Sequence, residues 1–166
     1  MFKETKALDL KSASFAVALY EVTGVLGGFA AGYISDRLFD GSRGKVGAFF
    51  MICLTLFITL FWYFDSNSFL INSLLFTLMG FFVYGPQVLV GVASADFASS
   101  KAIGTANGFA GSMAYLGSAI SGIVIGRLCD LYGWNSVIYF FIISSLFGAL
   151  FFMLSALSVK KNTVTK

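Results

Sequence analysis

The sequence predicts an all-α transmembrane protein with five membrane-spanning helices, and three observations support this fold class. Hydrophobic residues make up 58% of the chain and charged residues 11%, whereas a soluble protein carries about 25% charged residues. Apolar runs long enough for a bilayer-crossing helix, which needs about 20 residues, recur along the whole chain. These runs are continuously apolar, whereas the strands of a membrane β-barrel alternate polar and apolar residues.

Polar breaks between the apolar runs divide the chain into five expected spans. The spans are 12–35, 46–64, 69–95, 102–126 and 134–159. Basic residues before the first span are mixed with acids, and no cleavage site of small residues follows a short apolar core. We therefore expect the first span to be retained rather than removed as a signal peptide.

Glycine content separates the five spans into two kinds. The first, third and fourth spans are rich in glycine, whereas the second and fifth are dominated by Phe, Leu and Ile. Small residues allow membrane helices to approach closely. We therefore expect the first, third and fourth spans in the interior and the second and fifth against lipid. The glycines of the three interior spans are Gly24, Gly27, Gly28, Gly32, Gly80, Gly85, Gly91, Gly104, Gly108, Gly111, Gly117, Gly122 and Gly126.

Glu21 is the acidic residue that lies deepest within an expected span. At a rise of 1.5 Å per residue it lies about 14 Å past the start of its span, close to the bilayer midplane. An unpaired carboxylate there costs about 3 kcal/mol. No lysine or arginine lies within a span, so we expect its partner on a helix outside this chain. A protonated or locally hydrogen-bonded Glu21 in a helix interface is the alternative.

The third span contains Pro86, the only proline of the chain. Proline removes one helical hydrogen bond and leaves the carbonyl of Phe82 without its usual donor. With Gly85 before it, the helix is expected to kink. A kinked interior helix is typical of transporter gates, although a static kink without function fits the pattern equally well.

Neutral polar residues on the third and fourth spans are candidates for a substrate cavity, because polar groups within a membrane commonly serve function. We assign Gln87, Asn107 and Tyr115 to this cavity, together with Glu21. Hydrogen bonding between helices is the alternative for the polar face of the fourth span.

The connection from Gly32 to Gly44 contains Asp36, Arg37 and Arg43. It resembles the Asp-Arg/Gly-Arg loop signature of the major facilitator superfamily, in which acid and base hold two helix ends together on the cytoplasmic side. We therefore expect these three residues to form a structural ion-pair cluster that affects gating without touching substrate.

Four other segments resemble the organophosphate:phosphate antiporter family of this superfamily in order and spacing. This family includes the glycerol-3-phosphate and hexose-6-phosphate transporters and a hexose-phosphate sensor. The resemblance covers nearly all 166 residues, but only the last five helices of a twelve-helix fold, with Met1 just after the seventh helix. The segments are Leu19-Tyr20-Glu21 with Gly24, then 84–91, 101–108 and 114–117.

The resemblance implies a five-helix fragment of the C-terminal half of a major facilitator fold, so residues 1–166 would be a partial transporter domain. Such transporters exchange an organic phosphate for inorganic phosphate by rocking two halves about a midplane site. The two arginines that hold phosphate in the family belong to its first and seventh helices. Asn107 and Ala110 fall where the hexose-phosphate transporter has an acid and a lysine. This departure argues against hexose-phosphate specificity and leaves glycerol phosphate or a sensor-like role open.

Lysine and arginine counts predict the orientation, because cytoplasmic connections are richer in these residues. Seven lie on one side and four on the other, which favours a cytoplasmic C-terminus in a cell (inner or plasma) membrane. Lys160 to Lys166 would then lie inside and Asp65 to Ser68 outside. The side with seven carries Arg37, Arg43, Lys45, Lys101, Lys160, Lys161 and Lys166, and the other carries Lys3, Lys6, Lys11 and Arg127.

Three functions stay open. The chain is expected to be the C-terminal portion of a secondary active transporter, inactive without N-terminal helices from a companion chain or an upstream reading frame. The alternatives are a membrane sensor of hexose phosphate that signals to a kinase partner, and a truncated remnant without activity. An enzyme is not expected, because there is no histidine and no nucleophile elbow or phosphate-binding loop. We expect membrane lipid as a partner, and no cofactor, metal or nucleic acid.

Overall fold

The computed structural model describes residues 10–64 and 68–164, which fold into five long helices without any strand in this part of the chain. This result confirms the predicted all-α class. The helices are α2 (Leu10–Leu38), α3 (Arg43–Tyr63), α4 (Phe69–Phe97), α5 (Ile103–Tyr132) and α6 (Trp134–Val164).

Each helix contains a segment that is long and apolar enough to cross a membrane. These segments are Ser14–Leu38, Arg43–Tyr63, Leu70–Phe97, Ile103–Tyr132 and Trp134–Ser158. The chain is therefore a multi-pass membrane protein, as its composition predicts. Residues 1–9, 65–67 and 165–166, to which part of the predicted topology refers, lie outside the described residues.

The helices extend further than the expected spans. α3 begins at Arg43 rather than at 46, and α5 continues beyond 126 to Tyr132. The predicted breaks were placed at charged residues such as Lys45, Arg127 and Asp130, which lie inside helices in the structure. Charged side chains at helix ends can extend to water while the backbone stays helical, so charge marks the end of the apolar segment and not the end of the helix.

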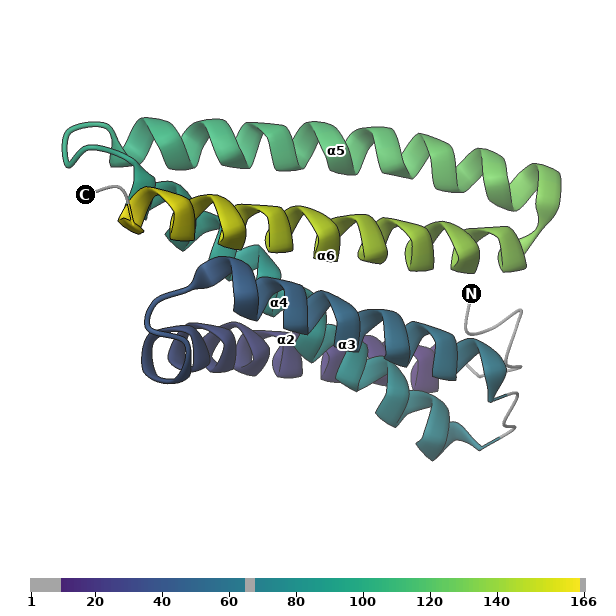
Figure 1. Cartoon of the computed structure of the whole chain (residues 1–166). Coiled ribbons are helices and arrows are strands. Elements are labelled where there is room, and N and C mark those ends of the chain that lie inside the picture. The colour runs from purple at the N-terminus through teal and green to yellow at the C-terminus, as the bar shows by residue number, and fades with distance from the viewer. Residues whose placement is uncertain (1–9, 65–67, 165–166) are drawn as a thin grey trace.

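The helices pack mainly as pairs. The most extensive contact is between α2 and α4, followed by α3 with α6 and α3 with α4, whereas α5 makes smaller contacts with α4 and α6. Figure 1 shows α5 at one edge of the bundle, running alongside α6. α4 thus contacts α2, α3 and α5, and the other elements are arranged around it.

Small residues make the α2–α4 contact close. A Cβ atom on Gly27 would collide with the carbonyl oxygen of Phe81, and one on Gly80 with the carbonyl oxygen of Tyr20. The two backbones therefore approach as the glycine stripe of the first span predicts. Thr23 adds a hydrogen bond from its hydroxyl to the carbonyl oxygen of Thr77, at 3.0 Å.

Burial within the described chain does not follow the expected division into interior and lipid-facing spans, which stays a prediction for the complete fold. α3 has eight buried residues, whereas α5 has none. α3 uses Gly44 and Gly47 to pack against Phe152 of α6, so only one side of it is left for lipid. The glycines of α5 have no neighbour within 4 Å of an added Cβ. Glycine content indicates that a helix can pack closely, but not which helix it packs against.

The best-packed region surrounds Phe50 of α3, which is 1% exposed. It contacts Ala31 of α2, Val46 of its own helix and Leu89 of α4. This cluster fixes the part of α4 that lies next to Pro86. The candidate site is built from the same part of α4.

A single residue, Gly133, connects α5 and α6. Its φ is +75° and its ψ is 179°, a backbone conformation that essentially only glycine adopts. Because the connection is this short, α6 must run back alongside α5.

Candidate functional site

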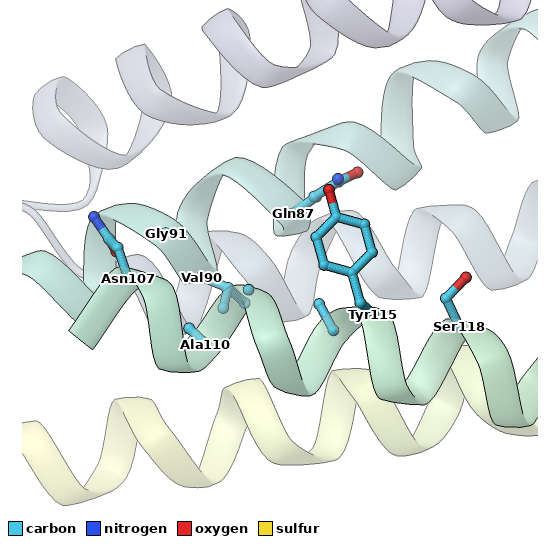
Figure 2. A pocket seen from close by; sticks show the side chains of 9 residues that line it. Gln87, Val90, Gly91, Asn107, Ala110, Tyr115 and Ser118 are labelled. Carbon is cyan, nitrogen blue, oxygen red and sulfur yellow. The ribbon is translucent and has the colours of Figure 1, made fainter. Parts of the chain in front are cut away.

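The cavity predicted from the neutral polar residues lies between α4 and α5. It has a volume of about 400 Å³ and is lined by residues that include Gln87, Asn107, Tyr115 and Ser118. Figure 2 shows Tyr115 projecting from α5 in the direction of Gln87 on α4. Three of the four predicted cavity residues are therefore brought together. Ser118 lies one helical turn after Tyr115 and also lines the cavity; it belongs to the predicted polar face of the fourth span but was not among the four predicted cavity residues.

Asn107 closes one end of this cavity through a contact between helices. Its side-chain carbonyl oxygen accepts a hydrogen bond from the hydroxyl of Ser94 on α4. The Ser94 hydroxyl oxygen also lies 2.8 Å from the carbonyl oxygen of Gly91, so its single proton has two acceptors within reach. The expected alternative for the polar face of α5, hydrogen bonding between helices, thus applies to Asn107, which in addition lines the cavity.

None of the described residues that line the cavity is charged. Its polar groups are an amide on each helix, a phenol and a hydroxyl, and its remaining wall consists of small residues such as Gly91, Ala110 and Gly111. Neutral donors and acceptors of this kind suit hydroxyl groups of a ligand. They do not by themselves neutralise a phosphate.

Glu21 does not line this cavity, in contrast to the prediction. Its carboxylate accepts a hydrogen bond from the Tyr84 hydroxyl of α4, so it has one partner within the chain, and a further partner on a helix outside this chain stays a prediction. The alternative, local hydrogen bonding in a helix interface, is what the structure shows. Gly24 lies against the Tyr84 ring, which leaves room for the ring between the two helices.

Gly85 and Pro86 are buried where α2, α3 and α4 meet. A Cβ atom on Gly85 would collide with the Phe50 ring and lie 3.1 Å from the Cβ atom of Ala31. α4 continues as one helix through Pro86. Gln87 follows directly in the chain. The tight packing of the Gly85-Pro86 step therefore fixes the backbone position from which the Gln87 side chain extends into the cavity.

Arg43 organises the ion-pair cluster expected at the first connection. Its guanidinium contacts the carboxylate of Asp36, donates to the hydroxyl of Ser35 at 3.0 Å and donates through Nε to the carboxylate of Asp96 at 3.1 Å. We call these four residues the Arg43 cluster. It joins the end of α2, the start of α3 and the end of α4.

The membership of the Arg43 cluster differs from the prediction in two ways. Arg37 is exposed and forms no ion pair with any residue that the structure describes. Asp96 and the buried Ser35 were missed. Asp96 is the one acidic residue near the end of the third span, and this position in the sequence could have indicated that it belongs to the cluster.

The comparison with known families decides the identity. A family model described as Major Facilitator Superfamily matches residues 2–166. The chain belongs to the major facilitator superfamily. The predicted resemblance of the Gly32–Gly44 connection to this superfamily is thereby confirmed.

Three relatives of this major facilitator chain show the narrower family. It is 34% identical over 164 residues to a probable hexose phosphate transport protein of Chlamydia pneumoniae, covering 98% of this chain and 36% of the relative. It is 36% identical over 143 residues to the membrane sensor protein UhpC of Escherichia coli, with 86% and 32% covered. It is 34% identical over 152 residues to the glycerol-3-phosphate transporter of Haemophilus influenzae, with 82% and 32% covered.

These relatives match the organophosphate:phosphate antiporter family, as the motif spacing predicted. The chain spans about a third of the length of each of them.

Proposed function

We propose that this chain forms the C-terminal portion of a secondary active transporter that exchanges an organic phosphate for inorganic phosphate. In this proposal the cavity between α4 and α5 is one wall of the substrate path. The transport functions of the hexose phosphate and glycerol-3-phosphate relatives support an organic phosphate as the substrate class. The polar lining of Gln87, Asn107 and Tyr115 supports the location.

The observation that carries the proposal is the absence of charge around the described cavity. An organic phosphate brings up to two negative charges, and holding it away from water requires fixed cations or many donors. The lysines and arginines of the described helices and connections each lie in a connection or within two turns of a helix end: Lys11, Arg37, Arg43, Lys45, Lys101, Arg127, Lys160 and Lys161. The chain therefore contributes neutral contacts to a ligand whose phosphate is neutralised by further helices, and it is inactive alone.

Exchange in liposomes tests this proposal. The chain alone, in phosphate-loaded vesicles, should show no uptake of labelled glycerol-3-phosphate or glucose-6-phosphate above empty vesicles. Joined to the part of the Haemophilus influenzae transporter that lies outside the matched region, it should support phosphate-dependent uptake. Asn107→Leu should abolish that uptake, whereas Ile123→Leu, on α5 but outside the cavity, should not. Saturable uptake by the chain alone would contradict the proposal.

A sensor of hexose phosphate is the second candidate, favoured by the 36% identity to the membrane sensor protein UhpC. A sensor binds its ligand without moving it. Binding of labelled glucose-6-phosphate by the completed protein, with no accumulation inside vesicles, would identify a sensor. A neighbouring pair of genes for a kinase and a response regulator would support the same conclusion.

The Arg43 cluster and the Gly85-Pro86 step are proposed to control gating rather than binding. Opposite charges that join three helix ends can favour one packing over another by a few kcal/mol at most. In the completed protein, Asp36→Asn should therefore change turnover with little change in KM. A rise in KM at unchanged turnover would assign the cluster to substrate binding instead.

A further inference from the structure

A second hollow lies between α3 and α6. It has a volume of about 470 Å³, within the range of about 300–1,000 Å³ that is typical of small-molecule sites. Its lining includes Ala48 and Ala156, beside the point where α3 and α6 approach most closely. A Cβ atom on Gly44 would lie 2.7 Å from the backbone nitrogen of Ala156. Two small residues between two close helices thus form a slot.

Large apolar side chains form the walls of this slot. Phe49 and Ile52 of α3 are about half exposed, and Leu157 of α6 is 65% exposed. They belong to the membrane-spanning segments Arg43–Tyr63 and Trp134–Ser158. In a membrane this exposed apolar surface faces acyl chains and not water.

Among the described residues that line the slot, Lys45 is the cation. Lys45 is the third residue of α3 and is exposed. It forms no ion pair with any described residue, whereas Arg43, two positions earlier, is occupied by Asp36 and Asp96. Ile52 lies seven residues further along α3, about 10 Å at a rise of 1.5 Å per residue, so the slot runs from a cation at the helix end into the apolar part of the span.

We propose that this α3–α6 slot binds one anionic phospholipid, with the phosphate beside Lys45 and an acyl chain along Phe49, Ile52 and Leu157. The apolar walls select a lipid over a soluble phosphate. Lys45, which forms no ion pair with a described residue, selects an anionic head group over a zwitterionic one.

Native mass spectrometry of the full 166-residue chain, released from detergent with phosphatidylglycerol or phosphatidylcholine of identical acyl chains, tests the proposal. A lysine near the membrane surface contributes about 1 kcal/mol to binding anionic lipid, so phosphatidylglycerol should be retained about fivefold more than phosphatidylcholine. Lys45→Gln should remove this preference. Lys101→Gln removes the same charge at the same end of the bundle, outside the slot, and should leave the preference intact.

Two further measurements separate the apolar and polar parts of the site. Ile52→Asn should lower the retention of both lipids, because it places an amide in the apolar wall. Millimolar glycerol-3-phosphate should not displace the lipid. Circular dichroism should show the same helix content for all variants. Equal retention of both lipids by the unmodified chain, an equal loss in the two lysine variants, or displacement by glycerol-3-phosphate would overturn the proposal.

Discussion

Tyr84 joins α4 to α2 through a contact between side chains that are 63 residues apart. Hydrogen bonds between membrane helices contribute about 0.6 kcal/mol on average and about 1.7 kcal/mol at most. Because Glu21 is exposed in this structure, we expect a value near the average.

A double-mutant cycle measures this contact. Tyr84→Phe and Glu21→Leu should each destabilise the chain by about 0.6 kcal/mol, and the double variant should cost less than their sum because both remove the same hydrogen bond. Reversible unfolding in mixed lipid–detergent micelles, followed by circular dichroism, gives the free energies. Tyr115→Phe is the matched control, because the Tyr115 hydroxyl has no hydrogen bond to a described residue. Strictly additive effects would show that the contact contributes nothing.

Arg43 provides a second prediction at this scale. Arg43→Gln should lower the free energy of unfolding by about 1 kcal/mol, because it removes two partly exposed ion pairs that each contribute about 0.2–1 kcal/mol. The loss should shrink in 1 M salt, where screening extends to about 3 Å. The same unfolding measurement at both salt concentrations tests this. Arg37→Gln, six residues earlier and without an ion pair in the described chain, should have no effect, and an equal loss would contradict the assignment.

The sequence indicated part of each contact. Asp36 and Arg43 were predicted to pair because their connection resembles the loop signature of the major facilitator superfamily. Asp96 lies 53 residues from Arg43, outside that signature, and was therefore missed. The meeting of distant helix ends depends on how the whole bundle packs.

The presence of each helix could be predicted from the sequence, but which helices pack against each other could not. Length and hydropathy identify a membrane helix because the bilayer fixes how many apolar residues it needs. Helices that are apolar on every side do not show which side meets a neighbour, because lipid tails are as apolar as leucine. α3 was therefore assigned to lipid, although its Gly44 and Gly47 pack against α6.

Glycine substitutions distinguish packed from open positions. Gly27→Ala should destabilise the chain by about 1–3 kcal/mol, the usual cost of overpacking, because the new methyl group would collide with the Phe81 carbonyl oxygen. Gly122→Ala on α5 meets nothing within 4 Å and should stabilise the helix, by up to about 1 kcal/mol from helix propensity. Unfolding free energies of both variants test the pair. Equal destabilisation would show that α5 packs as tightly as α2 in this chain.

For the whole molecule, the Arg43–Asp96 contact places the α2–α3 and α4–α5 connections at one end of the bundle. The α5–α6 connection at Gly133 must lie at the other end of the bundle, because one helix separates it from the α4–α5 connection.

The candidate cavity could be predicted in outline, because Gln87, Asn107 and Tyr115 are polar residues in apolar spans. The exclusion of Glu21 from the cavity could not be predicted, because only the packing of α2 against α4 directs the Glu21 side chain to Tyr84.

Labelling with a membrane-impermeant maleimide tests this arrangement and its orientation. In a background with Cys53→Ala and Cys129→Ala, Ser100→Cys should be labelled only from the cytoplasmic side and Asn135→Cys only from outside, as the excess of lysine and arginine predicts. Both positions are exposed. Labelling of the two positions from the same side would contradict the five-span topology, and exchanged sides would reverse the orientation.

Gly133 also has a mechanical consequence. It is the sole link between a helix of 30 residues and one of 31 residues, so α5 can pivot about this residue as a lever. A helix of this length measures about 45 Å at 1.5 Å per residue, and each degree of rotation at one end therefore displaces the other by about 0.8 Å. Asn107 lies near the end of α5 that moves furthest, so a rotation of a few degrees at Gly133 would separate Asn107 from Ser94 and widen the cavity mouth.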